Sequence, residues 1–548
     1  YKRQQLLYPS LLLTLLILTH ILCHSTWARL RDELHIGAPS WLLPALLVAI
    51  PVLLLELYPE TGFDATDYHL PFVRAFLEQH ALVFVPELRF PVFPQVCEVL
   101  FLLSEILGGD QAAKWIELLS VLLTADILYF WGNRELSPRV GAWAAALWLG
   151  TPLVIWIGSM AYVDATLVLF LTAALACWRR SQAGGDRWQL VTGFLVGMAA
   201  GTKYLGLFFC GVLGALALRG GARRATLFAL ALLVSAGPWY FRLLYTTGNP
   251  VFPFGATLFG SSEWSSQGPQ PAEAEVSEGL SESLTDTLGP VVWRIRYVLF
   301  LPWNSLFNRG IFHRVAPFSP WLLVLGPVLL VAWRERKVRP LILLVAMYTL
   351  VWIEIPRDLR FLLPILPPLY LALGAGVDRL WPRRIPSAAL TLLLLAPGPA
   401  YAVYKVHERG RPPGSTEAVE DYLSRQVPGY TCLQQLNRTD GENFVVYALG
   451  GGRLRHYARG HLLGDTRGPY GYNRVARVAD DPDELFHLLR GFGASHLLLA
   501  PKIGQLPGTA AFASRFALLY QSGDGFLLYE IRSHRRSAKP FGARTERP

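Results

Sequence analysis

The stretch that decides the fold is WLLPALLVAIPVLLLELYPETGFDATDYHLPFVRAF, residues 41–76. Its first half belongs to the apolar run 40–58, which is long enough for a membrane helix because a span needs roughly 17–25 residues. Its second half places Asp64, Asp67 and Arg74 just beyond that run. Acids at the edge of an apolar segment are costly and usually have a task. The stretch therefore predicts a membrane protein with chemistry at its surface.

The composition of the whole chain supports this reading. Of 548 residues, 52% are hydrophobic and 16% are charged, whereas average soluble proteins carry about 25% charged residues. Apolar runs recur at 40–58, 113–131, 140–157, 161–178, 188–202, 204–218, 225–243, 320–333, 340–353, 361–377 and 386–404, with a further run at 6–23. We therefore expect a polytopic α-helical membrane protein with about 11–12 transmembrane helices, in which 6–23 either spans or does not.

The basic residues indicate which loops face the cytoplasm. They collect in alternate loops as Arg134 and Arg139; Arg179, Arg180 and Arg187; Arg219, Arg223 and Arg224; Arg334, Arg336, Lys337 and Arg339; Arg379, Arg383 and Arg384. The positive-inside rule makes these loops cytoplasmic. The segments 59–111, 158–163, 244–318, 354–360 and everything after 404 then lie outside. The net charge of +10 is explained by orientation, so nucleic acid is not an expected partner.

The chain is expected to divide into three parts. Residues 1–404 form the membrane domain, with a first outer loop at 59–111 that contains juxtamembrane helices and a long outer loop at 244–318. Residues 405–532 form an extracytoplasmic α/β domain, and 533–548 form a basic, disordered tail. Strands are predicted at 444–449, 496–500 and 526–531, with a helix at 480–493. The glycine run at 448–457 lacks GxGxxG order, so we expect a tight turn there and no catalytic role for the domain.

Two acids at the outer face are candidates for chemistry. Asp64 precedes an amphipathic run that begins near Tyr68, which indicates a segment lying along the membrane surface. Asp164 begins the run 161–178, where it serves either as an ordinary helix N-cap or as a functional acid. Asp67 is expected to favour the N-terminus of the amphipathic helix. The alternative for Asp64 and Asp67 is that they jointly hold a divalent ion.

Three cations lie on the same face as these acids. Lys203 interrupts an apolar run, and Arg357 and Arg360 stand at the mouth of the run 361–377. Cations on the outer face run against the orientation rule. We therefore expect these cations to bind a ligand such as a phosphate; the alternative for Arg360 and Lys203 is that the side chain reaches the outer headgroups.

Together these residues predict one chemistry. A lipid-phosphate sugar keeps its tail in the bilayer and its phosphate at the interface. A carboxylate removes the proton from an acceptor hydroxyl as it attacks the anomeric carbon, and cations stabilise the departing phosphate. A transporter or flippase is the competing class, but it calls for polar groups through the membrane depth. The polar residues here gather at one face, which favours an enzyme.

The motifs resemble those of the GT-C superfamily of polytopic glycosyltransferases. FDATDYHLPFVRAFLEQH is similar to the first-loop acidic motif, in which an aspartate precedes a tyrosine by four positions; this selects Asp64 with Tyr68, followed by His69. FPVFPQVCEVLFLL is similar to the juxtamembrane helix that follows, and AYVDATLVLF to the second-loop acid, Asp164. GTKYLGL, GNPVFPF and RFLLPILPPL resemble stretches of bacterial members related to protein O-mannosyltransferases and the aminoarabinose transferase.

The resemblance implies a function and its residues. Asp64 would be the catalytic base, Asp164 would support it or bind donor or metal, and the donor would be a polyprenyl-phosphate-linked sugar. The acceptor would be a lipid, glycan or protein outside a bacterial plasma (inner) membrane. No firm cofactor follows; Mg²⁺ or Mn²⁺ on Asp64, Asp67 and Asp164 is the variant with a metal. A non-catalytic member that keeps the fold as a scaffold is a further alternative.

Overall fold

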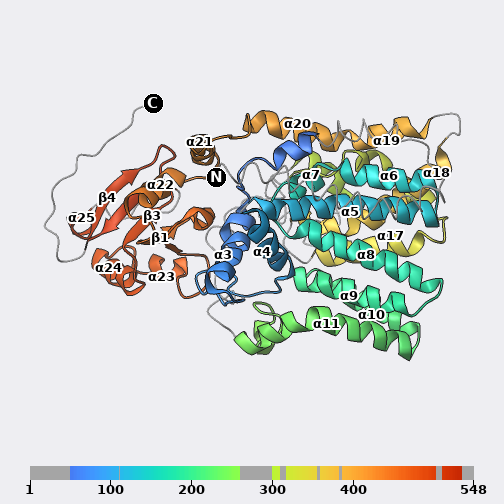
Figure 1. Ribbon diagram of the computed structural model, residues 1–548, viewed down its shortest axis with the longest axis horizontal. Coiled ribbons are helices and arrows are strands. Elements are labelled where there is room, and N and C mark those ends of the chain that lie inside the picture. The colour runs from blue at the N-terminus through green and yellow to red at the C-terminus, as the bar shows by residue number, and fades with distance from the viewer. Residues whose placement is uncertain are drawn as a thin grey trace, which may run out of the picture. The chain divides into compact units, whose positions relative to one another are not determined.

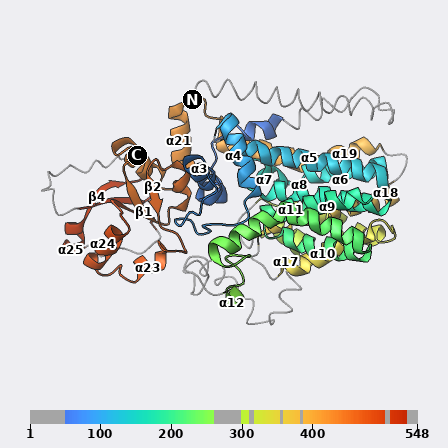
Figure 2. The ribbon, with the colours of Figure 1, turned by 60° about the horizontal axis from the view of Figure 1, so that its bottom comes forward.

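The computed structural model describes residues 50–109, 111–259, 299–308, 316–353, 358–381, 386–501 and 509–532 (Figures 1 and 2). The run 6–23, Arg357, much of the loop 244–318 and the tail 533–548 lie outside the described residues. The chain divides into two compact units. One comprises Tyr1–Tyr58, Gln95–Pro238 and Leu284–Thr416, and is called the membrane unit below; the other comprises Pro59–Pro94, Trp239–Ser283 and Glu417–Pro548, and is called the loop–sheet unit.

The membrane unit is built from apolar helices. Its first half contains α4 (Val96–Gly108), α5 (Ala112–Glu135), α6 (Pro138–Leu149), α7 (Pro152–Gly158), α8 (Asp164–Gln182), α9 (Arg187–Thr202), α10 (Gly206–Arg219) and the start of α11 (Ala222–Thr247). Helices α5, α6, α8, α9 and α10 lie side by side in Figure 1. This arrangement gathers several of the predicted spans into one bundle.

Glycines allow α5 and α6 to approach closely. A Cβ atom on Gly141 would lie 2.3 Å from the carbonyl oxygen of Tyr129, and one on Gly132 would lie 2.6 Å from the Cα atom of Gly141. Membrane helices commonly pack through such small residues, because lipid offers no hydrophobic drive for association. The pair therefore forms a tight antiparallel hairpin, and a larger side chain at either glycine would separate it.

The second half of the membrane unit contains shorter elements. They are α14 (Leu301–Phe307), α15 (Trp321–Leu325), η3 (Gly326–Val328), α16 (Leu329–Ala332), α17 (Arg339–Trp352), η4 (Leu359–Ile365), α18 (Leu366–Leu380), α19 (Ser387–Leu395) and α20 (Pro397–Arg409). The expected domain boundary at 405 falls inside α20, and the next helix begins at Thr416. Helix α20 therefore extends the apolar segment beyond position 405, and its last turn is polar.

Helix length and composition indicate which helices can cross a membrane. Among the described residues, four helices are long and apolar enough to span: Ala112–Glu135, Ala222–Thr247, Leu359–Leu380 and Ser387–Arg409. The pair α6 and α7 makes a fifth candidate, bent by 65° where Pro152 starts a new helix. A polytopic helical membrane protein is thus confirmed, whereas the expected total of about 11–12 spans stays a prediction.

The loop–sheet unit combines part of the first outer loop with the C-terminal domain. The loop contributes the π-helix η1 (Ala65–His69) and α3 (Leu70–Gln79), and α12 (Ala256–Phe259) comes from the middle of the chain. The C-terminal part contains α21 (Thr416–Gln426), α22 (Tyr430–Thr439), β1 (Val445–Leu449), η5 (Gly452–Tyr457), β2 (His461–Leu463), α23 (Tyr472–Ala476), α24 (Pro482–Gly491), β3 (His496–Leu499), α25 (Ala510–Arg515), β4 (Phe516–Gln521) and β5 (Leu527–Ile531).

The five strands form one mixed sheet in the order β2-β1-β3-β5-β4. Strand β1 is parallel to β2 and β3, whereas β5 is antiparallel to β3 and β4. The predicted strands at 444–449, 496–500 and 526–531 are confirmed as β1, β3 and β5. Strands β2 and β4 were not predicted, because β2 has only three residues and β4 exposes Leu518 and Leu519 near a register shift.

The predicted helix at 480–493 is confirmed as α24, and its capping agrees with the sequence. The Asp481 side chain accepts hydrogen bonds from the backbone amides of Asp483 and Glu484. Leu485 and Leu489 of this helix are fully buried in one core with Leu497 of β3. The C-terminal domain is therefore an α/β layer stabilised by burial of apolar surface.

Candidate active site

A cluster of charges in the membrane unit contains the second predicted acid. Asp164 is the first residue of α8 and is 2% exposed. Its Oδ1 lies 2.7 Å from Nζ of Lys203, which directly follows α9, and its Oδ2 lies 3.8 Å from Nη1 of Arg360. The structure thus brings together three residues that were selected separately from the sequence. Arg357, the remaining predicted cation, lies outside the described residues.

Arg360 is held in this cluster by a neighbour that the sequence reading did not assign. Asp358 accepts from Nε of Arg360 at 2.8 Å and pairs with Nη2 at 2.7 Å. Asp358 also accepts from the backbone amide of Arg360, so the same side chain both caps η4 and orients the guanidinium. In EIPRDLRF, Asp358 stands two residues before Arg360, and this spacing could have identified Asp358 from the sequence.

Aromatic rings border both cations. The guanidinium of Arg360 lies 4.9 Å from the ring centre of Tyr162, and Nζ of Lys203 lies 4.8 Å from that of Phe361. The Lys203 side chain is 23% exposed. An ammonium has three donors, and Asp164 accepts from this one, so Lys203 keeps donors for an anion. This arrangement fits anion binding by Lys203 better than a role in which the side chain simply reaches the lipid headgroups.

The start of α8 is capped by Glu117 of α5, not by Asp164. The Asp164 side chain makes no capping hydrogen bond, and the N-cap position is Val163. Glu117 is fully buried and accepts from the amides of Ala165 at 2.8 Å and Thr166 at 3.1 Å. The interpretation of Asp164 as an ordinary N-cap is therefore wrong. Because Glu117 satisfies the helix end, the carboxylate of Asp164 is available to Lys203 and Arg360.

The first predicted acid lies in the loop–sheet unit. Asp64 is half-buried and immediately precedes the π-helix η1. Tyr68 is half-buried and makes edge contacts with Phe90 and Phe93, at 5.8 and 6.0 Å between ring centres. His69 is buried and its ring lies 4.3 Å from that of Tyr68. The motif residues therefore form a packed turn that ends in the amphipathic helix α3.

Asp67 lies in the first turn of η1, which leads directly into α3, so its place near a helix start agrees with the sequence. It is also 0% exposed and faces two guanidinium groups, with Oδ1 at 2.9 Å from Arg455 and Oδ2 at 3.3 Å from Arg89. Asp465 contacts the same two arginines, at 3.2 Å from Arg89 and 3.4 Å from Arg455. We call these four side chains the ion-pair quartet. The sequence did not predict these ion pairs, which a buried carboxylate needs because its charge has lost water.

The charge states within the ion-pair quartet follow from burial and proximity. Burial raises the pKa of Asp67, and the nearby Arg455 and Arg89 act against that rise. Burial lowers the pKa of Arg89, but Asp67 and Asp465 outweigh it, so the pKa of Arg89 lies above its ordinary value. Arg89 therefore stays protonated at any physiological pH. Asp64 is close enough to act electrostatically on Asp67 and Arg89.

The glycine run after β1 forms a turn, as expected. Gly450 has φ of +83°, which favours glycine, and η5 begins two residues later. Helix η5 then makes further contacts with the first outer loop. The hydroxyl of Tyr457 donates to the carbonyl oxygen of Glu60, and Arg455 donates to that of Asp67. The run is thus a docking element for the loop and not a phosphate loop.

The described residues contain no group of three or more His, Cys, Asp or Glu side chains that could hold a metal ion. Asp67, one of the three acids considered for such a site, is already paired with two arginines. Asp164 is likewise paired with Lys203. These contacts do not suit a metal site built on Asp67, and dependence on Mg²⁺ or Mn²⁺ stays a prediction.

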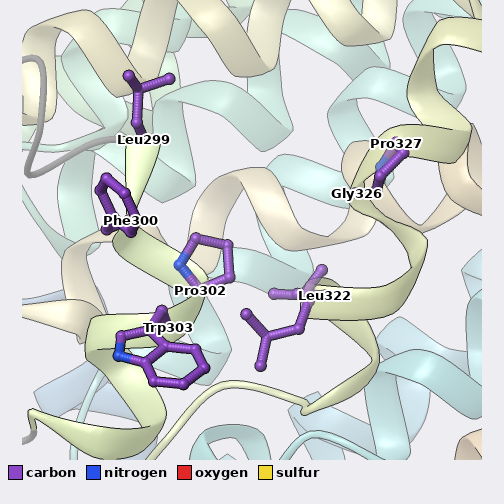
Figure 3. Close-up of a pocket in the computed structure, with 8 residues that line it drawn as sticks. Leu299, Phe300, Pro302, Trp303, Leu322, Gly326 and Pro327 are labelled. Carbon is purple, nitrogen blue, oxygen red and sulfur yellow. The ribbon is translucent and has the colours of Figure 1, made fainter.

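An apolar cavity of about 540 Å³ lies in the membrane unit (Figure 3). Leucine, phenylalanine, proline and tryptophan side chains line it, among them Phe300, Trp303 and Leu322. Among the described residues, no titratable or nucleophilic side chain lines the cavity. Its walls suit a hydrocarbon chain.

Two parts of the chain match the models of known sequence families. Residues 112–252 match the dolichyl-phosphate-mannose-protein mannosyltransferase family, and residues 418–529 match a family described as SF2091/S2213. An uncharacterized protein of Shigella flexneri, SF2093/S2215, is 34% identical over 127 residues. These residues are 23% of this chain and 63% of that protein, so the chain spans less than two thirds of this curated relative.

Solved structures define the class of fold. ArnT from Cupriavidus metallidurans bound to undecaprenyl phosphate has a TM-score of 0.56 and 15% identity, covering 92% of this chain and all of ArnT. The oligosaccharyltransferase from Archaeoglobus fulgidus in complex with zinc and sulfate has a TM-score of 0.51 and 13% identity, covering 88% and 73%. The chain has the fold of the GT-C polytopic membrane glycosyltransferases. Within it, the helices from α5 to α11 form the mannosyltransferase-like part.

Proposed function

We propose that the protein is a glycosyltransferase that moves a sugar from a polyprenyl-phosphate donor to an acceptor on the extracytoplasmic face of the membrane. The observation that carries the proposal is the convergence of Lys203 and Arg360 on Asp164 within a GT-C fold. Two cations fixed by carboxylates at the ends of membrane helices make a ready site for a lipid phosphate. The undecaprenyl phosphate in the related ArnT structure and the mannosyltransferase match support this donor class.

Each residue has a distinct role in the proposed reaction. Asp64 takes the proton from the acceptor hydroxyl while the hydroxyl oxygen forms a bond to the anomeric carbon of the sugar. The bond between that carbon and the phosphate oxygen breaks, and its electron pair stays on the phosphate. Lys203 and Arg360 stabilise the negative charge that develops there. Asp164 and Asp358 hold the two cations in place before the donor arrives.

The lipid part of the donor is suited to the membrane unit. The apolar cavity beside Phe300 and Trp303 offers a surface for part of an isoprenoid chain (Figure 3). Confining the donor to the membrane surface removes much of the entropy cost of bringing it to the acceptor. The acceptor is a lipid, glycan or protein of the cell envelope.

The proposal is tested with purified full-length protein in lipid nanodiscs. Radiolabelled undecaprenyl-phosphate mannose is the first donor, and an envelope extract supplies acceptors. We expect label to move to the extract with release of undecaprenyl phosphate. Other undecaprenyl-phosphate sugars are then tested in the same way, which names the sugar. Arg334→Gln is the control, because Arg334 is exposed on the membrane unit and belongs to none of the proposed contacts.

Two results would reject the proposal. Transfer that is unchanged in Asp64→Asn would remove the base from the mechanism. Label that crosses the bilayer of proteoliposomes while remaining on the lipid, with no transfer from any donor of the panel, would identify a transporter instead.

A further inference from the structure

One short helix of the C-terminal domain contacts the first outer loop on both sides of Asp64. Before Asp64, the hydroxyl of Tyr457 in η5 donates to the carbonyl oxygen of Glu60. After Asp64, Nη1 of Arg455 donates to both the carbonyl oxygen and Oδ1 of Asp67, each at 2.9 Å. Glu60 lies four positions before Asp64, and Asp67 lies three positions after it. The loop segment that carries the proposed base is therefore fixed at both ends by η5.

Further contacts of η5 leave little freedom between these two anchors. The guanidinium of Arg453 lies 5.5 Å from the ring centre of Phe63, the residue next to Asp64. Gly452 packs directly on the Asp67 carboxylate, because a Cβ atom there would lie 2.3 Å from Oδ1. The carboxylate of Glu60 accepts from the amides of Thr61 and Gly62, which stiffens the chain before Asp64.

Arg455 is the residue that joins these parts. Its side chain is 8% exposed, and its two terminal nitrogens reach Asp67, Asp465 and the carbonyl oxygens of Glu87 and Gly464. Only a planar fork of donors can serve several acceptors at once, so lysine would not replace it. Burial makes the arrangement strict, since removal of one partner leaves an uncompensated charge.

We propose that Arg455 is a positioning residue for the base, and that the C-terminal domain sets the conformation of the Asp64 turn through it. This inference rests on the proposed function, because it assigns Asp64 the role of base. Arg455 itself does not touch the reacting atoms; it acts through Asp67 and the π-helix η1. Catalytic groups must be held close to their productive geometry, and a displacement of about 1 Å can cost roughly a hundredfold in rate.

The experiment compares Arg455→Gln, Arg455→Lys and Gly452→Ala in the full-length protein. Arg490→Gln and Gly491→Ala are matched controls in the same domain, because Arg490 is exposed and a Cβ on Gly491 meets nothing within 4 Å. Turnover and donor KM are measured with the labelled undecaprenyl-phosphate sugar that serves the unmodified protein. Hydrogen exchange of peptides that cover residues 61–70 reports the conformation of the turn without any need for activity.

We expect Arg455→Gln to lower kcat by about 10- to 100-fold with little change in donor KM. Gly452→Ala should act in the same direction, Arg455→Lys should recover only part of the loss, and both controls should match the unmodified protein. Exchange over 61–70 should accelerate in the three test variants. In an Asp64→Asn background, Arg455→Gln should cause no further loss, because a residue that acts through the base has no effect once the base is gone.

The outcomes separate this inference from the proposed function. An equal loss in both backgrounds, or unchanged exchange over 61–70 in all three variants, would overturn the positioning role. If Asp64→Asn retains full turnover, the base assignment fails, and the role of Arg455 in positioning a base fails with it. Faster exchange in that case would show that the turn is held for another purpose, whereas faster exchange with the background-dependent loss supports both proposals.

Discussion

At the residue scale, the sequence located the acids but could not say what they contact. Asp64, Asp164, Lys203 and Arg360 were selected from local motifs, and the structure brings the last three together. Asp67 is expected near a helix start, and it lies in the first turn of η1. Its charge partner Arg455 lies 388 residues away, and no local pattern points to such a distance. The predicted role of a residue is therefore least secure where burial imposes distant charge pairing.

Asp64 and Asp67 should respond differently to loss of charge. Asp64→Asn should lower turnover by about 10²–10⁴-fold, because the proposed base is removed. It should leave stability nearly unchanged, because Asp64 is only half-buried. Asp67→Asn should destabilise the loop–sheet unit by about 3–5 kcal/mol, because two arginines lose a buried partner. Thermal unfolding and turnover are measured for both variants. Full turnover in Asp64→Asn together with a stable but inactive Asp67→Asn would reverse the two roles.

Lys203 and Arg360 should matter for the donor more than for the acceptor. Lys203→Gln or Arg360→Gln should weaken donor binding roughly ten- to hundredfold, because a charge-assisted contact is worth about 1.5–3 kcal/mol. Binding of undecaprenyl phosphate is measured directly by titration in nanodiscs, with Arg334→Gln as control. Donor affinity that is unchanged in both variants would exclude the cluster from phosphate binding.

At the element scale, long apolar helices and buried strands could be predicted because each carries its own periodic signal. Helices α5 and α8 and strands β1, β3 and β5 fall where the sequence placed them. The π-helix η1 and the short strand β2 could not be predicted, since each owes its geometry to contacts with other parts of its unit. Glu117 shows the same limit, because it sits mid-helix in α5 and caps the start of α8.

Glu117 should therefore be a stability residue of the membrane unit. Glu117→Ala leaves two buried amide donors at the start of α8 without their acceptor, and each such donor costs about 1–3 kcal/mol. Glu117→Gln keeps one acceptor oxygen and should lose less. Glu335→Ala is the control, since Glu335 makes a largely exposed pair with Arg379 worth at most about 1 kcal/mol. Melting temperatures in detergent rank the three variants, and equal values for Glu117→Ala and Glu335→Ala would contradict the capping role.

At the scale of the whole molecule, composition and spacing predicted a polytopic helical protein with an α/β domain, and the motif resemblance predicted the GT-C fold. The polytopic helical domain and the α/β domain were both expected, and the comparisons confirm the GT-C fold. The grouping of the first outer loop with the C-terminal domain was not expected. Hydropathy reports where a segment lies relative to lipid, but it carries no information about which outer segments pack together.

The predicted orientation can be tested with single cysteines in a variant that lacks the native ones. Ala183 and Ala511 are both exposed, the first in a basic loop and the second in the C-terminal domain. A membrane-impermeant maleimide applied to intact spheroplasts should label Ala511→Cys and spare Ala183→Cys, because basic loops face the cytoplasm. Both should react after the membrane is opened. The opposite pattern in intact cells would place the loop with the proposed base inside.

The long separation between Asp67 and Arg455 also concerns how the protein is made. Asp67, in the same loop as Asp64, leaves the ribosome 388 residues before its partner Arg455. At roughly 5–20 residues per second, about 20–80 s pass before the two can meet. During that interval the nascent chain holds the proposed base without the contacts that support its turn. Under the proposed function, a chain interrupted before Arg455 is therefore expected to transfer sugar more slowly than the full-length protein.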